Sequence, residues 1–158
     1  MNGNAVGKES ASKVALQRGG MRRYVLDANA LIGFFEGRQA ASGKVRQILG
    51  EALRLEIPLL MSAVNWGEVF YMEWRYYGES KARTVESELH RLPIAVIGVD
   101  LERATRAAAL KQKHNLGYAD AFAAELAIER GAWLVTADPE FSKLGKMLSV
   151  YTLPRHET

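Results

Sequence analysis

The chain has 158 residues, of which 48% are hydrophobic and 25% are charged, and its formal net charge is +3. These proportions are typical of a single folded domain with a hydrophobic core, and they exclude an intrinsically disordered chain. No apolar run approaches the roughly 20 residues of a membrane-spanning helix, so we expect no membrane contact. The chain contains no cysteine, which excludes disulfides and thiolate metal sites and fits a cytoplasmic location.

The first 20 residues differ in composition from the rest of the chain. This segment, MNGNAVGKESASKVALQRGG, is rich in Gly, Ser and Asn and has no sustained apolar period, which predicts a flexible tail. It lacks the apolar stretch of a signal peptide. Met21 directly precedes the first predicted strand and is a second candidate for the native start, which would make the tail non-native. We expect one domain over residues 21–154 and a short C-terminal tail at 155–158.

The remaining sequence alternates between short apolar runs and helical patterns. The runs predict strands at 23–26, 57–63, 93–99 and 132–137, with a fifth near 149–153. Between them, helical patterns and capping residues predict helices at about 28–36, 40–56, 64–78, 79–91, 100–115 and 119–130. Strands that alternate with helices are joined by right-handed crossovers, which pair them in parallel. We therefore expect an α/β three-layer sandwich around a central, mainly parallel sheet of four to five strands.

Four acidic residues occur where these elements meet. Asp27 ends the first strand, and Glu68 lies in the first turns of the helix that follows the second strand. Asp120 opens the helix before the fourth strand, and Asp138 lies just past that strand. In open parallel sheets, functional sites lie outside the carboxyl ends of the strands. The four acids can therefore meet at one edge of the sheet.

Each acid taken alone has an ordinary structural explanation. Asp27 and Asp138 stand where N-caps are expected, Asp120 can complement a helix dipole, and Glu68 can be a solvated first-turn residue. Two carboxylates about 4 Å apart, however, repel by about 4 kcal/mol at an effective dielectric near 20, whereas a cap contributes about 1 kcal/mol. Four acids together therefore indicate a bound cation. Oxygen ligands without cysteine favour Mg²⁺ or Mn²⁺.

The acids occur in four short motifs, which are YVLDANALI, SAVNWGEVF, LGYADAFAAELA and WLVTADPEF, in this order. In these motifs the chain resembles the PIN-domain family of metal-dependent ribonucleases, and in size the toxins of VapBC-type toxin–antitoxin pairs. The resemblance extends from Met21 to about Pro154. It implies that the catalytic and metal-binding residues are Asp27, Glu68, Asp120 and Asp138. It also implies supporting polar roles for Asn29, Ser62 and Thr136.

The resemblance further implies a mechanism. One or two divalent ions bind the acids together with a backbone phosphate of RNA, and a water molecule attacks phosphorus in line without a covalent enzyme intermediate. The expected products carry a 5′-phosphate and a 3′-hydroxyl. The histidines at 90, 114 and 156 match no spacing of a nucleophilic triad.

Basic side chains supply candidates for RNA contacts. One predicted helix ends shortly before Asp120 and carries Arg103, Arg106, Lys111 and Lys113. These cations are placed either to contact phosphates around the acids or to form an ordinary solvated helix face. Further candidates are Arg22, Arg23 and Arg75.

Aromatic side chains recur at helical spacing in the predicted helix at 64–78. They are Trp66, Phe70, Trp74 and Tyr77, and Phe34 and Phe35 are candidates for the same surface. Core packing is one explanation, and a dimer or partner interface is the other. The resemblance favours an interface, because such toxins typically form homodimers and bind an antitoxin protein.

Three functions remain open from the sequence. The first, which we expect, is a Mg²⁺- or Mn²⁺-dependent endoribonuclease that acts as the toxin of a toxin–antitoxin pair. The second is a PIN nuclease of RNA processing or decay without an antitoxin. The third is a non-enzymatic, receiver-like module with an acidic pocket, which would leave Glu68 and Asp120 unexplained.

Overall fold

The structure is a computed structural model that describes residues 22–155. The predicted tail at 1–20 and residues 156–158 lie outside the described residues. The strands are β1 (Tyr24–Leu26), β2 (Leu59–Ser62), β3 (Ile94–Ile97), β4 (Trp133–Thr136) and β5 (Ser149–Thr152). The helices are α2 (Ala28–Phe35), α3 (Gln39–Leu55), α4 (Ala63–Tyr77), α5 (Glu79–Leu89), α6 (Leu101–His114), α7 (Tyr118–Arg130) and the 3₁₀ helix η1 (Pro139–Met147).

Every predicted strand and helix is present near its expected position, and only η1 is additional. The second and third strands begin later than predicted, because a proline precedes each of them. Pro58 has no N–H to donate, and the first ladder bond there runs from the Leu59 N–H to the carbonyl of Pro93, at 2.9 Å. Within residues 22–155, no helix combines the length and the apolar character required to cross a bilayer.

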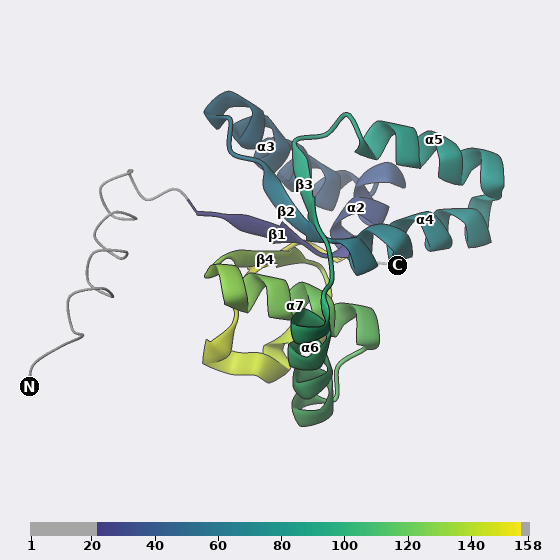
Figure 1. Cartoon of the computed structure of the whole chain (residues 1–158). Helices are drawn as coiled ribbons and strands as arrows, with labels where there is room; N and C mark the ends of the chain where they lie inside the picture. Colours follow the sequence, from purple (N-terminus) through teal and green to yellow (C-terminus); the bar gives the residue numbers. More distant parts are fainter. Residues whose placement is uncertain (1–21, 156–158) are drawn as a thin grey trace, which may run out of the picture.

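The five strands form one sheet in the order β3-β2-β1-β4-β5, and every pair is parallel. The expectation of a central, mainly parallel sheet is therefore confirmed. The chain builds outward from β1 to β3, then crosses to the other side of β1 to add β4 and β5 (Figure 1). The strand order thus reverses between β1 and β4, and ligands of open α/β sheets bind at such a switch point, beyond the carboxyl ends of the strands.

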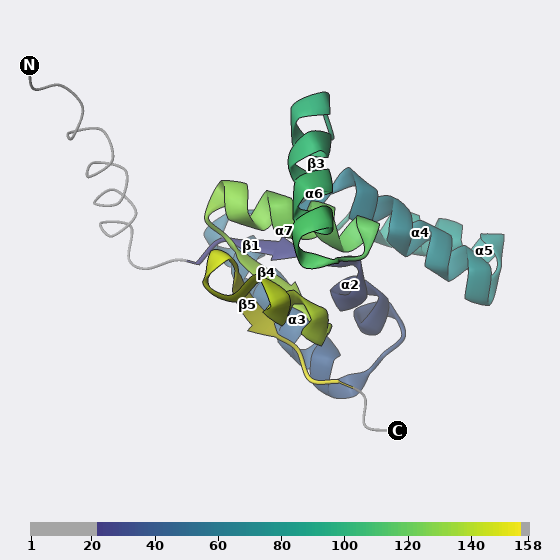
Figure 2. The ribbon, with the colours of Figure 1, turned by 90° about the horizontal axis from the view of Figure 1, so that it is seen from below.

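Helices cover both faces of the sheet, and each face has its own hydrophobic core (Figures 1 and 2). Adjacent residues of β1 serve different cores, because side chains alternate across a strand. Leu26 packs in the core formed by α2, α3 and α5, and Val25 packs in the core formed by α7 and η1. The expected three-layer α/β sandwich is confirmed.

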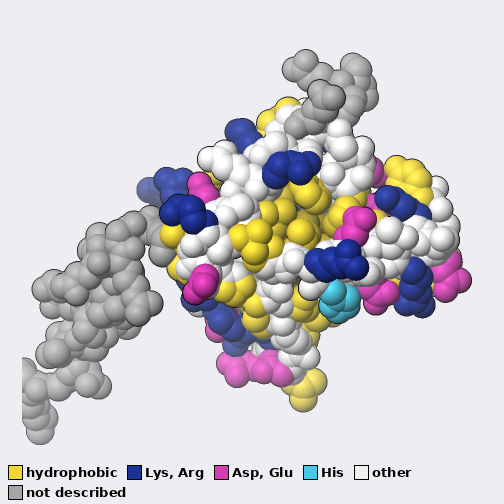
Figure 3. All heavy atoms as spheres, turned by 90° about the horizontal axis from the view of Figure 1, so that it is seen from above, with side chains coloured by type: hydrophobic (Ala, Val, Ile, Leu, Met, Phe, Trp, Pro, Cys, Tyr) yellow, Lys and Arg dark blue, Asp and Glu magenta, His cyan; other side chains and the backbone are white. Residues whose placement is uncertain are grey.

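The hairpin of α4 and α5 extends sideways beyond the sheet (Figures 1 and 2). Figure 3 views the molecule from the side on which α3 and α5 lie uppermost in Figure 1. Hydrophobic side chains occupy the middle of this face, and charged side chains lie around them. Exposed hydrophobic residues include Leu53 of α3 and Val96 of the edge strand β3, which are 64% and 42% exposed.

Candidate active site

The first acid lies at the end of the central strand. Asp27 follows β1 and is only 1% exposed, and its backbone N–H donates to the carbonyl of Val135 on β4 at 3.1 Å. The buried hydroxyl of Thr136 donates a 2.7 Å hydrogen bond to Asp27 Oδ2. Asp27 occupies the N-cap position of α2, but its side chain makes no capping hydrogen bond. The sheet therefore holds this carboxylate, which does not act as a helix cap.

Asp138 is linked to Asp27 through the same hydroxyl group. The backbone N–H of Asp138 donates to Thr136 Oγ1 at 3.0 Å. Its carboxylate does cap a helix, because Oδ1 accepts from the Glu140 N–H at 2.8 Å and Pro139 begins η1. The cap uses one carboxylate oxygen of Asp138, so the other oxygen remains for a ligand.

Two of the predicted polar residues fix the backbone around these acids. Asn29 Oδ1 accepts from the Ala137 N–H at 3.1 Å, which ties the start of α2 to the end of β4. Ser62 is the last residue of β2, and its hydroxyl accepts from the Val64 N–H at 3.3 Å as the N-cap of α4. Ser62 therefore sets the start of the helix that carries Glu68.

Glu68 lies on α4 and Asp120 on α7, and Asn65 joins these two helices. The sequence patterns did not single out Asn65. Asn65 of α4 is fully buried, and its Nδ2 donates to the carbonyl of Ala119 in the first turn of α7 at 3.0 Å. Asn65 lies one turn before Glu68, so the bond brings the Glu68 helix against the start of α7. The available signal in the sequence was the polar residue Asn65, which stands one helical turn before Glu68.

Gly117 makes room for Asp120 at the start of α7. A Cβ atom at Gly117 would lie 2.6 Å from Asp120 Oδ2, closer than real contacts allow. Gly117 is the N-cap residue of α7, and its φ of −57° is open to any residue type. The glycine therefore leaves space for this position of the Asp120 carboxylate, and its backbone conformation does not require glycine.

The four acids are coupled electrostatically. Burial raises the pKa of Asp27 from 3.8 to about 7; the Thr136 hydrogen bond opposes this shift, and the charges of the other three acids add to it. Burial, together with the charge of Asp120, also raises the pKa of Glu68. The pKa of Asp120 is raised by burial and then by Asp138 and Glu140, against the effect of Lys143. Acids from four parts of the sequence thus share one region of negative potential.

The donor set of this region suits a hard divalent cation. It consists of carboxylate oxygens supported by hydroxyl and amide groups, which are the ligands that Mg²⁺ and Mn²⁺ prefer. Within residues 22–155, no three Asp, Glu or His side chains converge closely enough to chelate one ion as they stand. Mg²⁺ usually keeps several of its water ligands and uses one or two carboxylates, so three converging acids are not a requirement. The acids therefore fit such an ion by donor type and by charge.

The arginines of α6 that were candidates for RNA contacts have protein partners. Glu125 of α7 is 3% exposed, and it pairs with Arg103 at 2.7 Å and with Arg106 at 2.8 Å. Lys111 donates to the carbonyl of Leu116 at 2.8 Å. The arginine pairs join α6 to α7 and the lysine bond joins α6 to the loop between them, so these contacts favour a structural role for three of the four cations. Lys113 is exposed and forms no ion pair with any residue of the described chain.

The predicted aromatic surface is partly core and partly exposed. Phe34 and Phe35 pack edge to face, with ring centroids 5.3 Å apart, against the core of α2 and α3. Trp66 also packs there, whereas Trp74 and Tyr77 are 42% and 55% exposed. The exposed aromatic rings are therefore concentrated toward the end of α4, together with Tyr71 and Tyr76.

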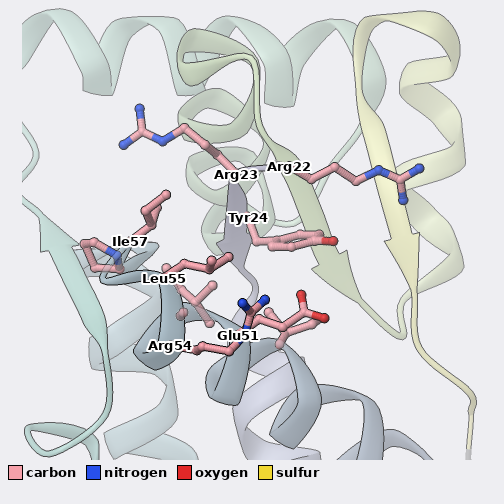
Figure 4. Close-up of a pocket in the computed structure, with 11 residues that line it drawn as sticks. Arg22, Arg23, Tyr24, Glu51, Arg54, Leu55 and Ile57 are labelled. Atoms are coloured by element: carbon pink, nitrogen blue, oxygen red, sulfur yellow. The ribbon is translucent and has the colours of Figure 1, made fainter. Parts of the chain in front are cut away.

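A cavity of about 530 Å³ lies at the opposite end of β1, away from the acids (Figure 4). Arg22, Arg23 and Arg54 line it, and Figure 4 shows Arg22 and Arg23 extending in opposite directions. The guanidinium of Arg22 stacks over the ring of Trp133, 4.3 Å from its centroid. Strand β1 separates these arginines from Asp27, so they do not belong to the acidic site.

The chain is similar to several solved structures. A toxin–antitoxin complex from Klebsiella pneumoniae contains a chain with 25% identity and a TM-score of 0.56, over 82% of this chain and 96% of that one. The DNA-bound VapBC of Salmonella typhimurium gives 18% identity and a TM-score of 0.64, over 84% and 98%. VapC20 of Mycobacterium tuberculosis, a toxin that cleaves the sarcin-ricin loop, gives 17% and 0.60, over 83% and 99%.

No curated protein matches the sequence. The model of the PIN domain family matches residues 24–147, which include every strand and helix from β1 to η1 and the four acids. This family comprises nucleases that generally use divalent metals. The match covers more than half of the chain, and the similar solved structures include a VapC toxin and toxin–antitoxin complexes. The chain belongs to the PIN domain family.

Proposed function

We propose that this protein is a Mg²⁺- or Mn²⁺-dependent endoribonuclease and the toxin of a toxin–antitoxin pair. The observation that carries the proposal is the buried Asp27, whose pKa is raised to about 7 by burial and by three acids from other parts of the chain. A group kept in this state destabilises the fold at neutral pH unless a cation compensates it. Members of the family generally use divalent metals, which supply that compensation.

The residues of the site would divide the work as follows. Asp27, held by Thr136, is the rigid ligand, and Asp120 and Glu68 complete the negative region from their helices. A divalent ion, when bound, supplies positive charge to phosphate oxygens and lowers the pKa of a water molecule. Asp138 has one carboxylate oxygen engaged in the helix cap, so it contributes through the other oxygen.

The toxin assignment rests on likeness and on the exposed aromatic rings. The relative at 25% identity is the toxin–antitoxin complex from Klebsiella pneumoniae. The exposed rings of Trp74 and Tyr77 on the α4–α5 hairpin supply a surface of the kind that binds a partner protein. We propose that an antitoxin or a second copy of the chain covers this surface.

The decisive experiment is RNA cleavage by the purified chain with Mg²⁺, with Mn²⁺ and with EDTA. The matched control is Asp27→Asn, with circular dichroism to verify that the variant is folded. We expect cleavage with either ion, and none with EDTA or with the variant. Cleavage that survives EDTA, or that a folded Asp27→Asn variant retains, would contradict the proposed mechanism. Growth arrest on expression of the wild type, but not of the variant, tests the toxin role.

A further inference from the structure

A second cavity, of about 320 Å³, adjoins the acidic site. Its volume is at the lower end of the range for small-ligand sites. Asn29 and Asp138, which belong to the acidic site, form part of its wall. Arg38 and Arg155 also line it, and they bring two guanidinium groups to the same space. Cations and acidic-site residues thus share one cavity, which is not the case for the arginines of α6.

The backbone and the side chain of Arg38 are both held in place. In the turn between α2 and α3, its N–H donates to the carbonyl of Gly33 at 3.1 Å, and its carbonyl accepts from the Ser42 N–H at 2.9 Å. A Cβ atom at Gly33 would lie 3.6 Å from Arg38 Cδ, so the arginine stem crosses α2 at its glycine. The side chain passes over this glycine, and both residues line the cavity.

One carboxylate orients the Arg38 guanidinium without occupying all of it. Glu36 Oε2 pairs with Arg38 Nη2 at 2.6 Å, and Glu36 Oε1 accepts from the Tyr77 hydroxyl at 3.3 Å. A guanidinium has five N–H donors in a planar fork, so most of them remain after this pair. The Arg38 side chain is 43% exposed. An oriented, partly exposed guanidinium of this kind suits a phosphate, which it can bind through two parallel hydrogen bonds.

Arg155 reaches the cavity from the other side. It follows β5 by a short segment in which the buried Leu153 donates its N–H to the carbonyl of Thr136 at 2.8 Å. Because Thr136 also binds Asp27 and Asp138, this bond ties the segment directly to the acidic site. The bond between Leu153 and Thr136 therefore holds Arg155 near Asp138, and both residues line the cavity.

We propose that Arg38 and Arg155 bind the RNA phosphate next to the scissile one, with the intervening nucleotide in the 320 Å³ cavity. This inference rests on the proposed function. It places the substrate path across the α2–α3 turn and the end of β5, and not along α6. The arginines position the substrate and take no part in the chemical step.

The test is the salt dependence of RNA binding. The probe is a short fluorescein-labelled oligouridylate, and the protein carries Asp27→Asn to prevent cleavage. For single-stranded nucleic acid, the slope of log K against log salt decreases by about 0.7 for each phosphate that the protein no longer neutralises. Because the two arginines share one phosphate, we expect a partial decrease with Arg38→Gln or with Arg155→Gln, and a decrease of about 0.7 with both. Arg38→Lys, which keeps the charge, should retain the slope.

The matched control is Arg91→Gln, an exposed arginine after α5 that lies outside this cavity. It should leave the slope unchanged. If the folded double variant has the wild-type slope, the inference is wrong, and an acidic segment of a partner protein becomes the better occupant. Cleavage assays with the native Asp27 distinguish failure of this inference from failure of the proposed function. Cleavage whose KM is unaffected by the double substitution overturns only the inference, whereas arginine-dependent binding without any cleavage overturns only the proposed function.

Discussion

The buried carboxylate of Asp27 should make the stability of the metal-free protein fall as pH rises. Its pKa is raised from 3.8 to about 7 in the folded state, so the folded protein holds a proton that the unfolded chain releases. Below about pH 4 both states are protonated and there is no penalty. Between about pH 4 and 7 the unfolded chain ionises first, and stability is lost. This rise of the pKa from 3.8 to about 7 corresponds to a loss of about 4 kcal/mol at neutral pH.

Asp27→Asn removes this penalty and keeps an oxygen that can accept from Thr136. In EDTA, the variant should therefore match the wild type near pH 4 and exceed it by up to about 4 kcal/mol near pH 8. Urea denaturation, followed by circular dichroism across this pH range, measures the difference. Mg²⁺ should stabilise only the wild type, by about 2.7 kcal/mol at a hundred times its Kd. A pH-independent difference, or a variant that is less stable at pH 8, would refute the reasoning.

Three further substitutions separate structural from functional roles. Thr136→Val removes the donor to Asp27 and the acceptor for the Asp138 N–H, so it should cost about 1–3 kcal/mol in urea denaturation and raise the pKa of Asp27 further. Gly117→Ala forces Asp120 to move, and we expect kcat to fall far more than Tm; an unchanged kcat would show that this position of Asp120 is dispensable. Arg103→Gln leaves the buried Glu125 with Arg106 as its remaining partner, so we expect a loss of about 3 kcal/mol with unchanged RNA affinity, measured on the folded variant.

The role of α6 shows where reasoning from the sequence was limited. Its basic residues form a row shortly before Asp120, and local spacing alone predicts a cationic face. The structure pairs Arg103 and Arg106 with Glu125, which lies on the following helix. Glu125 stands within an alanine-rich helix whose middle is buried on all sides, and a buried carboxylate requires cationic partners. The lone acid in AFAAELA was therefore the available signal for a structural ion pair.

The sequence by itself determined the alternation of strands and helices and the positions of the acids along it. These features depend on residues close in the chain: apolar runs fix the strands, and a residue just past a strand must lie at the carboxyl edge of a parallel sheet. The order β3-β2-β1-β4-β5, which puts Asp27 beside the end of β4, was decided only in three dimensions. The same holds for the Asn65 bond to α7 and for the cavity shared by Arg38 and Arg155. Each of these joins segments whose separation is set by how the helices pack on the sheet, and packing depends on the shape of the whole core, which no local pattern records.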